Sequence, residues 1–295
     1  MIDGPAVIDG IVVVDKAAGW TSHDVVAKCR GIFGQKRVGH AGTLDPGATG
    51  VLLVGLGRVT RLLRYPGALP KKYAGEVVLG TETSTLDNEG KVTATHDMSG
   101  VGIDDARAAA AQFVGDIEQV PPMVSAVKVG GRRLHELARA GEAVERDARP
   151  VTVYRFDVLA EPAPGAFTID VECSSGTYVR VLAADLGRAL GGGAHLRHLR
   201  RTAVGGFSVN EARAVEALDL DAVLSPLEAM RGYPRVMVAG AMVDDVRHGR
   251  VLEASALDVE GDGPWAVLDS GGALLAVYEP YDDARVKPAV VIASV

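Results

Sequence analysis

GHAGTLDPGATGVLLV, residues 39–54, is the stretch around which we expect this fold to be organised. Its first twelve residues contain four glycines, a proline, His40 and Asp45, and its last four, Val51 to Val54, form a continuous apolar run typical of a buried strand. A loop with so many glycines is costly in backbone entropy unless its shape is used. We therefore predict a tight turn at Asp45. The carboxylate is either bonded to backbone amides there or available for chemistry.

The charge around this loop is strongly asymmetric. Between Lys28 and Tyr73 Asp45 is the only acid, among nine bases: Lys28, Arg30, Lys36, Arg37, Arg58, Arg61, Arg64, Lys71 and Lys72. Nearby cations stabilise an ionised carboxylate, so Asp45 is a candidate nucleophile or base. A solvated basic face is the alternative interpretation, since charge runs commonly serve only solubility. His40 is a turn residue, a general base or an RNA contact, and the sequence does not rank these roles.

Strand and helix patterns alternate along the chain. Residues 10–14, 51–54 and 76–79 are apolar runs that predict strands, and residues 167–173 alternate as a half-buried strand does. One helix is predicted to follow an N-cap within Trp20–Ser22 and to run through Phe33. Asp104 is predicted to cap a second helix that ends near Gly115, and a third runs from Val179 to Leu190. The fold class is therefore mixed α and β.

Composition changes twice along the chain. Residues 121–150, bracketed by prolines, contain six bases and four acids and are predicted to be an insertion that projects from the core. The basic sequence ends near Gly232, so we divide the chain into residues 1–232 and 233–295. In the second part, a hairpin (265–268 and 274–278) and a last strand (289–293) predict a small β-rich domain.

Composition excludes several classes of protein. The chain has 295 residues, 47% hydrophobic and 23% charged, which argues against disorder, collagen and coiled coil. We find no apolar run of eighteen residues and no secretory signal, so we expect a cytoplasmic protein. Cys29 and Cys173 lie too far apart in sequence to suggest a zinc knuckle, and we expect both to be reduced thiols in the core. The net charge of -7 taken alone argues against a nucleic-acid partner. Residues 214–295, however, have six bases and fourteen acids, or 6 - 14 = -8, so the acidic excess lies in this segment and not in the rest of the chain.

Five ordered motifs resemble those of the TruB family of tRNA pseudouridine-55 synthases. They are VVVDK with GWTS (12–16, 19–22), GHAGTLDPGATGVLL (39–53), KKY with LG (71–73, 79–80), GTYVR (176–180) and AHLRHLRR (194–201). Ala17 differs, because the family usually has proline after the lysine. The resemblance implies an α+β fold: a mixed, largely antiparallel catalytic sheet with an inserted thumb (about 121–150), plus a small PUA-like RNA-binding barrel.

The resemblance also implies the reaction and the roles of individual residues. A uridine at position 55 of tRNA is isomerised to pseudouridine without cofactor or metal. Asp45 matches the essential aspartate, which attacks the substrate covalently or removes a sugar proton. The matching substrate-binding residues are His40, Tyr73, Tyr178, Arg180 and Leu199. Of these, Tyr73 stacks on the uracil, Arg180 pairs with the carboxylate, and His40 contacts flipped-out nucleotides; Lys16 supports the site.

The expected partner is the T stem-loop of tRNA, with no membrane and no obligate protein partner, and we expect a monomer. A stacked uridine must be flipped out, which costs a few kcal/mol that phosphate contacts can offset. The predicted backbone contacts are Lys128, Arg132, Arg133, Arg197, Arg200 and Arg201. The acidic balance makes the C-terminal part a weak electrostatic binder of RNA.

Two other functions are considered. A non-catalytic RNA-binding module would need the basic face and the thumb but not Asp45, and the complete set of Asp45, Tyr73 and Arg180 disfavours it. A glycoside hydrolase usually needs two carboxylates flanking the bond, and the single acid between Lys28 and Tyr73 disfavours that function.

Overall fold

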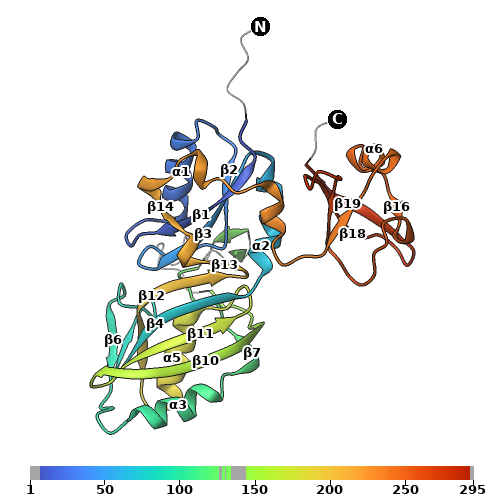
Figure 1. Ribbon diagram of the computed structural model, residues 1–295. Coiled ribbons are helices and arrows are strands. Elements are labelled where there is room, and N and C mark those ends of the chain that lie inside the picture. The colour runs from blue at the N-terminus through green and yellow to red at the C-terminus, as the bar shows by residue number, and fades with distance from the viewer. Residues whose placement is uncertain (1–6, 126–127, 130, 134–143, 293–295) are drawn as a thin grey trace. The chain divides into compact units, whose positions relative to one another are not determined.

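The chain forms two compact units. The computed structural model describes residues 7–125, 128–129, 131–133 and 144–292. Unit 1 comprises Met1–Asp45, Val51–Ala68 and Gly205–Val295, and unit 2 comprises Pro46–Gly50 and Leu69–Val204. Figure 1 labels their helices and strands.

The first part of unit 1 is built on the predicted apolar strands. Strand β1 (Gly10–Lys16) contains Ile11 to Val14, each at most 3% exposed. It lies between β14 (Arg213–Ala214), to which it is parallel, and β3 (Thr49–Leu56). Strand β2 (Val38–Ala41) pairs antiparallel with β3. Two short helical segments follow β3, η1 (Gly57–Arg61) and α2 (Arg64–Ala68).

Helix α1 (Ser22–Ile32) begins within the predicted cap region, and Thr21 is its N-cap. The Thr21 hydroxyl accepts a hydrogen bond from the Asp24 amide at 3.1 Å, and the Asp24 carboxylate accepts one from the Thr21 amide at 2.8 Å. This capping box satisfies amide groups that have no partner within the helix. The Thr21 hydroxyl also donates to the Asp24 carboxylate at 2.7 Å, and this bond, together with the one from the Thr21 amide, lowers the pKa of Asp24 from its usual value.

Unit 1 also contains a five-stranded C-terminal sheet. Its order is β15 (Arg235–Met237), β17 (Trp265–Leu268), β18 (Leu274–Pro280), β19 (Arg285–Val291) and β16 (Leu252–Glu253), with helix α6 (Ala241–Arg247). The predicted hairpin is confirmed, and Asp269 closes it by accepting bonds from Gly271 and Ala273. The last strand begins at Arg285 rather than at residue 289. Pairing with β18 resumes directly after the turn at Asp282, which accounts for the earlier start.

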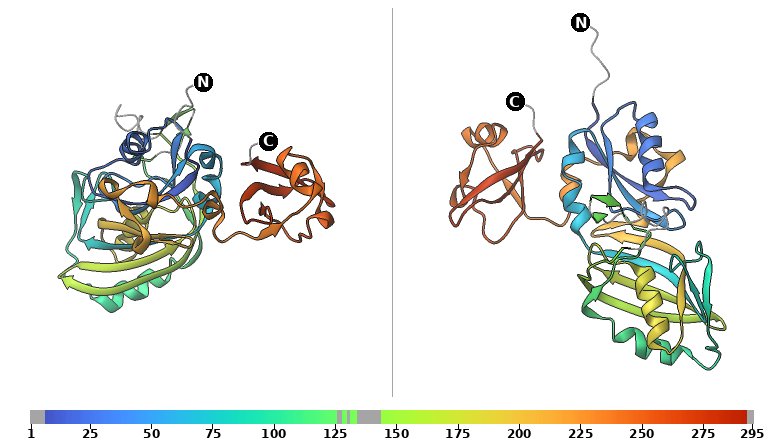
Figure 2. Two further views of the ribbon diagram at one scale, coloured as in Figure 1. Left: turned by 45° about the horizontal axis from the view of Figure 1, so that its top comes forward. Right: turned by 180° about the vertical axis from the view of Figure 1, so that it is seen from behind.

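Unit 2 is organised around an antiparallel sheet. The order is β12 (Ala194–Val204), β4 (Lys71–Leu79), β11 (Ala166–Cys173), β10 (Arg149–Ala163) and β7 (Gly115–Gln119). Helices α3 (Ile103–Ala111) and α5 (Val179–Ala189) lie on one face of this sheet (Figures 1 and 2). Two short strands, β5 (Thr81–Thr83) and β6 (Val92–Thr95), form a separate ribbon.

Helix α3 also protects an edge of the sheet. The Arg107 guanidinium donates hydrogen bonds to the carbonyls of Val158 and Leu159 on β10, beyond the part of β10 that pairs with β7. Unpaired strand edges invite association with other strands, and this side chain covers two exposed acceptors. The predicted cap, Asp104, is wrong: Gly102 is the N-cap, its amide donates to the Asp105 carboxylate at 3.0 Å, and the helix begins at Ile103. It ends at Ala111 instead of near Gly115, because strand β7 starts at Gly115.

The predicted insertion is only partly described. Strands β8 (Lys128–Val129) and β9 (Arg132–Arg133) form a short antiparallel ribbon. Residues 126–127, 130 and 134–143, which belong to the predicted thumb, lie outside the described residues. At the other end of the predicted segment, Arg149 and Pro150 belong to β10. The insertion stays a prediction.

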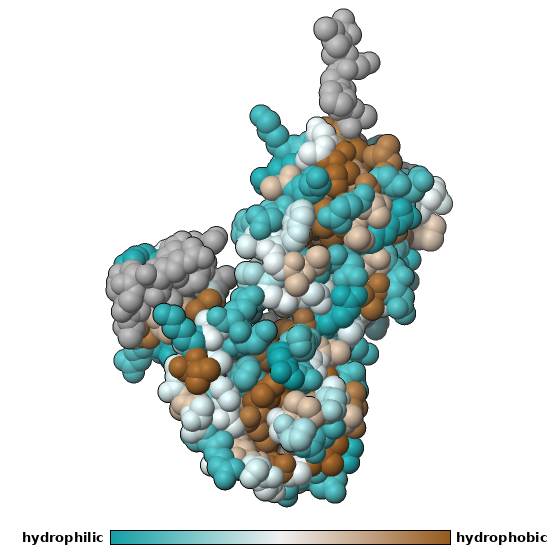
Figure 3. Space-filling model, turned by 90° about the vertical axis from the view of Figure 1, so that its left-hand side faces the viewer, coloured by the Kyte–Doolittle hydropathy of each residue, from teal (hydrophilic) through white to brown (hydrophobic). Residues whose placement is uncertain are grey.

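These elements confirm the mixed α+β class, with strands that pair both parallel and antiparallel. Cys29 and Cys173 are confirmed as buried free thiols, and burial raises the pKa of each to about 11. On the face seen in Figure 3, hydrophobic residues are interspersed with hydrophilic ones. None of the helices formed by the described residues has the length and apolar character that crossing a bilayer requires.

The predicted boundary between residues 232 and 233 does not follow the division into units. Tyr233 donates its hydroxyl to the Tyr65 carbonyl at 2.9 Å, and Glu279 accepts bonds from Tyr65 and Arg64, so the residues after 232 are grouped with α2 in unit 1. The boundary stays a prediction.

Candidate active site

Unit 1 contains three of the predicted site residues. Asp45 is partly exposed in the loop between β2 and β3. The residue before it is anchored: the Leu44 amide donates to the Ser22 hydroxyl at 3.0 Å, and that hydroxyl donates to the Leu44 carbonyl at 3.3 Å. Ser22 is 1% exposed at the start of α1, so the helix start fixes the backbone beside Asp45. Sequence analysis predicted this cap region but not its contact with the loop.

Lys16 and His40 occupy the neighbouring elements. Lys16 is fully buried at the end of β1 and donates its Nζ to the carbonyls of Trp20 at 2.7 Å and Ala17 at 3.0 Å. This closes the turn between β1 and α1, so the position of Ala17 does not depend on a proline. The His40 ring on β2 packs edge-on against His23 of α1, with ring centroids 5.4 Å apart.

Two glycines of the loop adopt backbone conformations that other residues rarely adopt. Gly42 and Gly50 have φ angles of 73° and 99°, which side chains rarely adopt. At Gly50 a Cβ would stand 2.2 Å from the Arg201 carbonyl oxygen of the neighbouring strand β12. Glycine is therefore required where β3 begins beside β12.

Unit 2 contains the remaining four residues for which substrate binding is predicted. Tyr73 lies within β4, opposite Val171 of β11 and Arg201 of β12, and is 9% exposed. The backbone of Tyr73 is thus fixed by strands on both sides, which is compatible with the stacking role predicted for its ring.

Tyr178 and Arg180 lie together at the start of α5. Tyr178 is the residue before the first helical turn, and the Arg180 guanidinium lies 5.8 Å from its ring centroid. Arg180 is 4% exposed and donates to the carbonyls of Val124 at 2.8 Å and Thr85 at 3.4 Å. The predicted pairing of Arg180 with Asp45 joins residues of different units and stays a prediction.

Leu199 is placed by an irregularity in β12. Arg197 is opposite Glu76 and Arg200 is opposite Ala74, so His198 and Leu199 together face the single residue Gly75. His198 has a φ of 57°, in the left-handed region. Such a bulge bends the strand and redirects its side chains. Within this bulge, Leu199 lies close to Gly75: its Cδ1 is 3.5 Å from the position that a Cβ would have at Gly75.

Two buried cations stand on neighbouring strands beside Tyr73. Arg201 is 1% exposed and Lys71 is 4% exposed. Burial, together with the charge of Arg201, lowers the pKa of Lys71 to about 8, and its Nζ donates to the Leu69 carbonyl at 2.7 Å. The burial of Arg201 argues against the phosphate contact predicted for it, because a phosphate cannot reach an enclosed guanidinium.

The other predicted RNA contacts differ in their surroundings. Arg197 is partly exposed and pairs with Glu76, and Arg200 donates to the Thr49 hydroxyl at 3.4 Å. Arg132 is exposed on β9. The backbones of Lys128 and Arg133 belong to the same ribbon, and their side chains lie outside the described part. Their contacts with RNA stay predictions.

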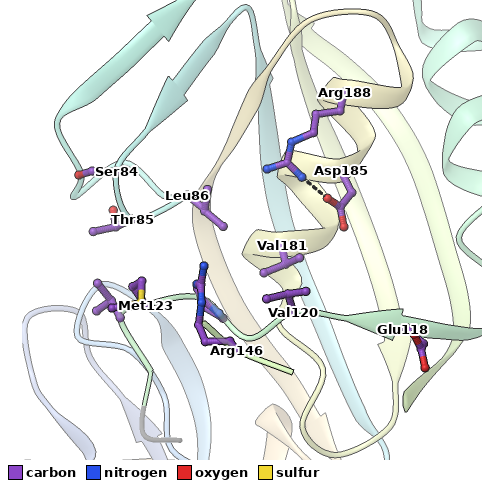
Figure 4. Close-up of a pocket in the computed structure, with 12 residues that line it drawn as sticks. Ser84, Thr85, Leu86, Glu118, Val120, Met123, Arg146, Val181, Asp185 and Arg188 are labelled. Carbon is purple, nitrogen blue, oxygen red and sulfur yellow. Dashed lines mark hydrogen bonds and ion pairs between the residues drawn. The ribbon is translucent and has the colours of Figure 1, made fainter. Parts of the chain in front are cut away.

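Sequence analysis missed a pocket in unit 2 with a volume of about 500 Å³ (Figure 4). Thr85 and Val124, whose carbonyls hold Arg180, line it, and the ion pair of Asp185 and Arg188 stands on its α5 wall. Burial raises the pKa of Asp185. The pocket combines segments far apart in sequence, so no local pattern predicts it. Within the described residues, no group of three or more His, Cys, Asp or Glu side chains could hold a metal ion.

Comparison with known proteins gives concordant results. Residues 30–179 match the model of the TruB family pseudouridylate synthase (N terminal domain), and residues 180–231 match the tRNA pseudouridylate synthase B C-terminal domain. The tRNA pseudouridine synthase B of Mycobacteroides abscessus is 47% identical over 91% of both chains, and that of Mycobacterium sp. (strain KMS) is 45% identical over 99% of this chain and 98% of its own.

A solved structure shows the same fold at lower identity. The match is to a chain in the crystal structure of a Cbf5-Nop10-Gar1 complex, with a TM-score of 0.75 and 26% identity over 97% of this chain and 85% of that chain. The fold and the matched sequence models define the class of protein, which is a pseudouridylate synthase. Within this class, the chain belongs to the TruB family.

Proposed function

We propose that this enzyme isomerises the uridine at position 55, in the T-arm loop of tRNA, to pseudouridine, with Asp45 as the essential carboxylate. The observation that carries the proposal is identity of 45% to 47%, over at least nine-tenths of the chain, to enzymes named tRNA pseudouridine synthase B. The five ordered motifs support it, since they include Asp45, Tyr73 and Arg180.

The reaction is an isomerisation and needs no redox partner. The bond between ribose C1′ and uracil N1 breaks, the uracil rotates, and a bond forms between C1′ and C5. The hydrogen on C5 leaves as a proton and N1 gains one, so atoms and charge balance. Asp45 acts as the reacting anion, by covalent attack or by removing a sugar proton.

The other residues bind and orient the substrate. The target uridine is flipped out of the arm, and Tyr73 stacks on its uracil while Tyr178 and Leu199 line the pocket. Arg180 holds the carboxylate ionised and oriented, Lys16 supports the loop, and His40 contacts the flipped-out nucleotides. Five cations contact phosphates of the T stem-loop: Lys128, Arg132, Arg133, Arg197 and Arg200. The chain acts as a monomer without an obligate protein partner, and residues 233–295 form a PUA-like domain.

Tritium release from a T stem-loop labelled at uracil C5 tests the proposal, because only the isomerisation displaces that hydrogen. The wild type should release tritium and yield pseudouridine after digestion. Asp45→Asn should abolish release and keep RNA binding, because it removes the anion while nearly preserving shape. The matched control is Asp104→Asn, on a carboxylate that is 92% exposed and paired with Arg107; it should remain active.

Two results would contradict the proposal. Free uracil with an abasic site, in place of pseudouridine, would indicate a glycosidase. Retained isomerisation by purified Asp45→Asn would show that this carboxylate is not the reacting group.

A further inference from the structure

Gln119 is a buried polar residue outside the predicted site. It is the last residue of β7 and is 2% exposed. Its Oε1 accepts a hydrogen bond from the Tyr178 amide at 2.8 Å, and its Nε2 donates one to the Tyr178 carbonyl at 3.2 Å. One side-chain amide therefore holds both backbone polar groups of a residue 59 positions away.

The start of α5 depends on this contact. Tyr178 precedes the first helical residue with φ -102° and ψ 105°, and its own side chain makes no capping bond. Its carbonyl also accepts bonds from Val181 at 3.0 Å and Leu182 at 3.2 Å. Gln119 thus fixes the peptide groups on both sides of Tyr178, from which the first turn of α5 and Arg180 follow.

The anchor itself is rigid. Strand β7 pairs with β10 in a continuous register from Gly115 to Gln119, with Gln119 opposite Arg149. The side-chain amide is therefore presented from a sheet, and its two bonds connect that sheet to the helix start that contains Tyr178 and Arg180.

We propose that Gln119 is a positioning residue for the isomerisation: its amide orients the Tyr178 backbone, and through it the Tyr178 ring and the Arg180 guanidinium in the uridine site. The inference rests on the proposed function. It adds a residue that acts on the reaction without touching the substrate.

The chain offers a matched control. The side-chain amide of Gln35 makes the same pair of bonds with Ile8: its Oε1 accepts from the Ile8 amide at 3.0 Å, and its Nε2 donates to the Ile8 carbonyl at 3.0 Å. None of the predicted site residues takes part in this contact. Gln35→Met and Gln119→Met therefore remove equivalent bonds, and only the second removes them beside the site.

The test measures three quantities for the full-length wild type and both variants: single-turnover tritium release at saturating enzyme, T stem-loop affinity, and the denaturation midpoint. For Gln119→Met we expect release to slow by about 10- to 100-fold, since small misplacements of catalytic groups have effects of this size. Affinity should stay within about threefold, because phosphate contacts dominate it. Gln35→Met should keep a near-normal rate.

Gln119→Glu adds a readout that a general structural role would not move. A protonated carboxyl can accept from the Tyr178 amide and donate to its carbonyl, as the native amide does, whereas an ionised one cannot donate. Burial raises the pKa of a carboxyl into the accessible range. The rate of Gln119→Glu, divided by the wild-type rate at each pH, should therefore rise between pH 8.5 and 6. The same ratio for Gln119→Met should stay flat.

Each outcome separates the two proposals. A wild type without tritium release would overturn the proposed function, whatever the variants do. An active wild type with Gln119→Met within twofold of its rate would overturn the role of Gln119, as would equal losses in Gln119→Met and Gln35→Met. If Gln119→Met does not fold, the pH ratio of Gln119→Glu decides, and a flat ratio contradicts the inference.

Discussion

At the scale of single residues, Lys71 is the group whose protonation the fold changes most clearly. It is enclosed on β4 beside the buried Arg201, and its pKa falls from 10.5 to about 8. Below pH 8 both folded and unfolded chains have a charged Lys71, so its effect on stability is constant. Between pH 8 and 10.5 the unfolded chain binds more protons, so this group makes stability rise with pH.

Lys71→Met tests this sign. Methionine keeps an unbranched side chain and removes the charge, so titration of all other groups cancels when the two proteins are compared. As pH rises from 8 to 10, the free energy of unfolding of the wild type should increase relative to that of the variant by about 1 kcal/mol per pH unit. Urea titrations at half-unit intervals measure this. A difference independent of pH would mean that Lys71 keeps its ordinary pKa.

Sequence motifs indicate candidate residues well where the residue type itself suggests chemistry. Asp45 among nine bases indicates a candidate reactive group, and the order of the five motifs predicts the family, which the comparisons confirm. Gln119 and Ser22 give no such signal, because their partners Tyr178 and Leu44 are 59 and 22 positions away. The burial of Arg201 could not be predicted either. Two bulges in β12 interrupt the alternation of side chains between the two faces of the sheet, so the sequence does not show on which face Arg201 lies.

At the scale of elements, the bulge in β12 gives a prediction about His198. Its φ of 57° is tolerated by glycine and strongly disfavoured for a β-branched residue. His198→Val should therefore destabilise the protein by about 1 to 3 kcal/mol, whereas His198→Gly should stay within about 1 kcal/mol of the wild type. Thr202→Val, at the second bulge but without a positive φ, is the control. Equal stability of the two His198 variants in urea titrations would show that the backbone there is unstrained.

The ribbon of β8 and β9 gives a second prediction at this scale. If Lys128, Arg132 and Arg133 contact phosphates, replacing all three by alanine should make the plot of log affinity against log salt shallower by about 2 to 3. A control triple takes exposed cations outside the ribbon: Lys91, Arg213 and Arg235. Fluorescence anisotropy of a labelled T stem-loop between low and moderate salt measures both slopes. Equal slopes for the ribbon variant and the wild type would remove the phosphate role.

At the scale of the whole molecule, the sequence predicted the β-rich C-terminal part but not its grouping with α2. The hairpin from Trp265 onward follows from local alternation and turn residues. The contacts of Tyr233 and Glu279 with Tyr65 join segments more than 160 residues apart, and no local pattern contains them. This C-terminal part nevertheless has its own core, which includes Val246, Trp265 and Tyr278.

A chain that ends at Pro234 tests what this part contributes. The removed residues have five bases and ten acids, or 5 - 10 = -5, so their loss does not weaken the attraction of the remaining chain for RNA. The shortened chain keeps Tyr233 and its bond to Tyr65. We expect it to unfold cooperatively, to release tritium from the T stem-loop, and to keep the salt dependence of binding. Glu279→Gln, which removes the charge that pairs with Arg64 and keeps an amide oxygen that can accept from the Tyr65 hydroxyl, is the control and should change the free energy of unfolding by less than about 1 kcal/mol. A shallower salt dependence in the shortened chain would instead show that cations of this acidic segment contact phosphates.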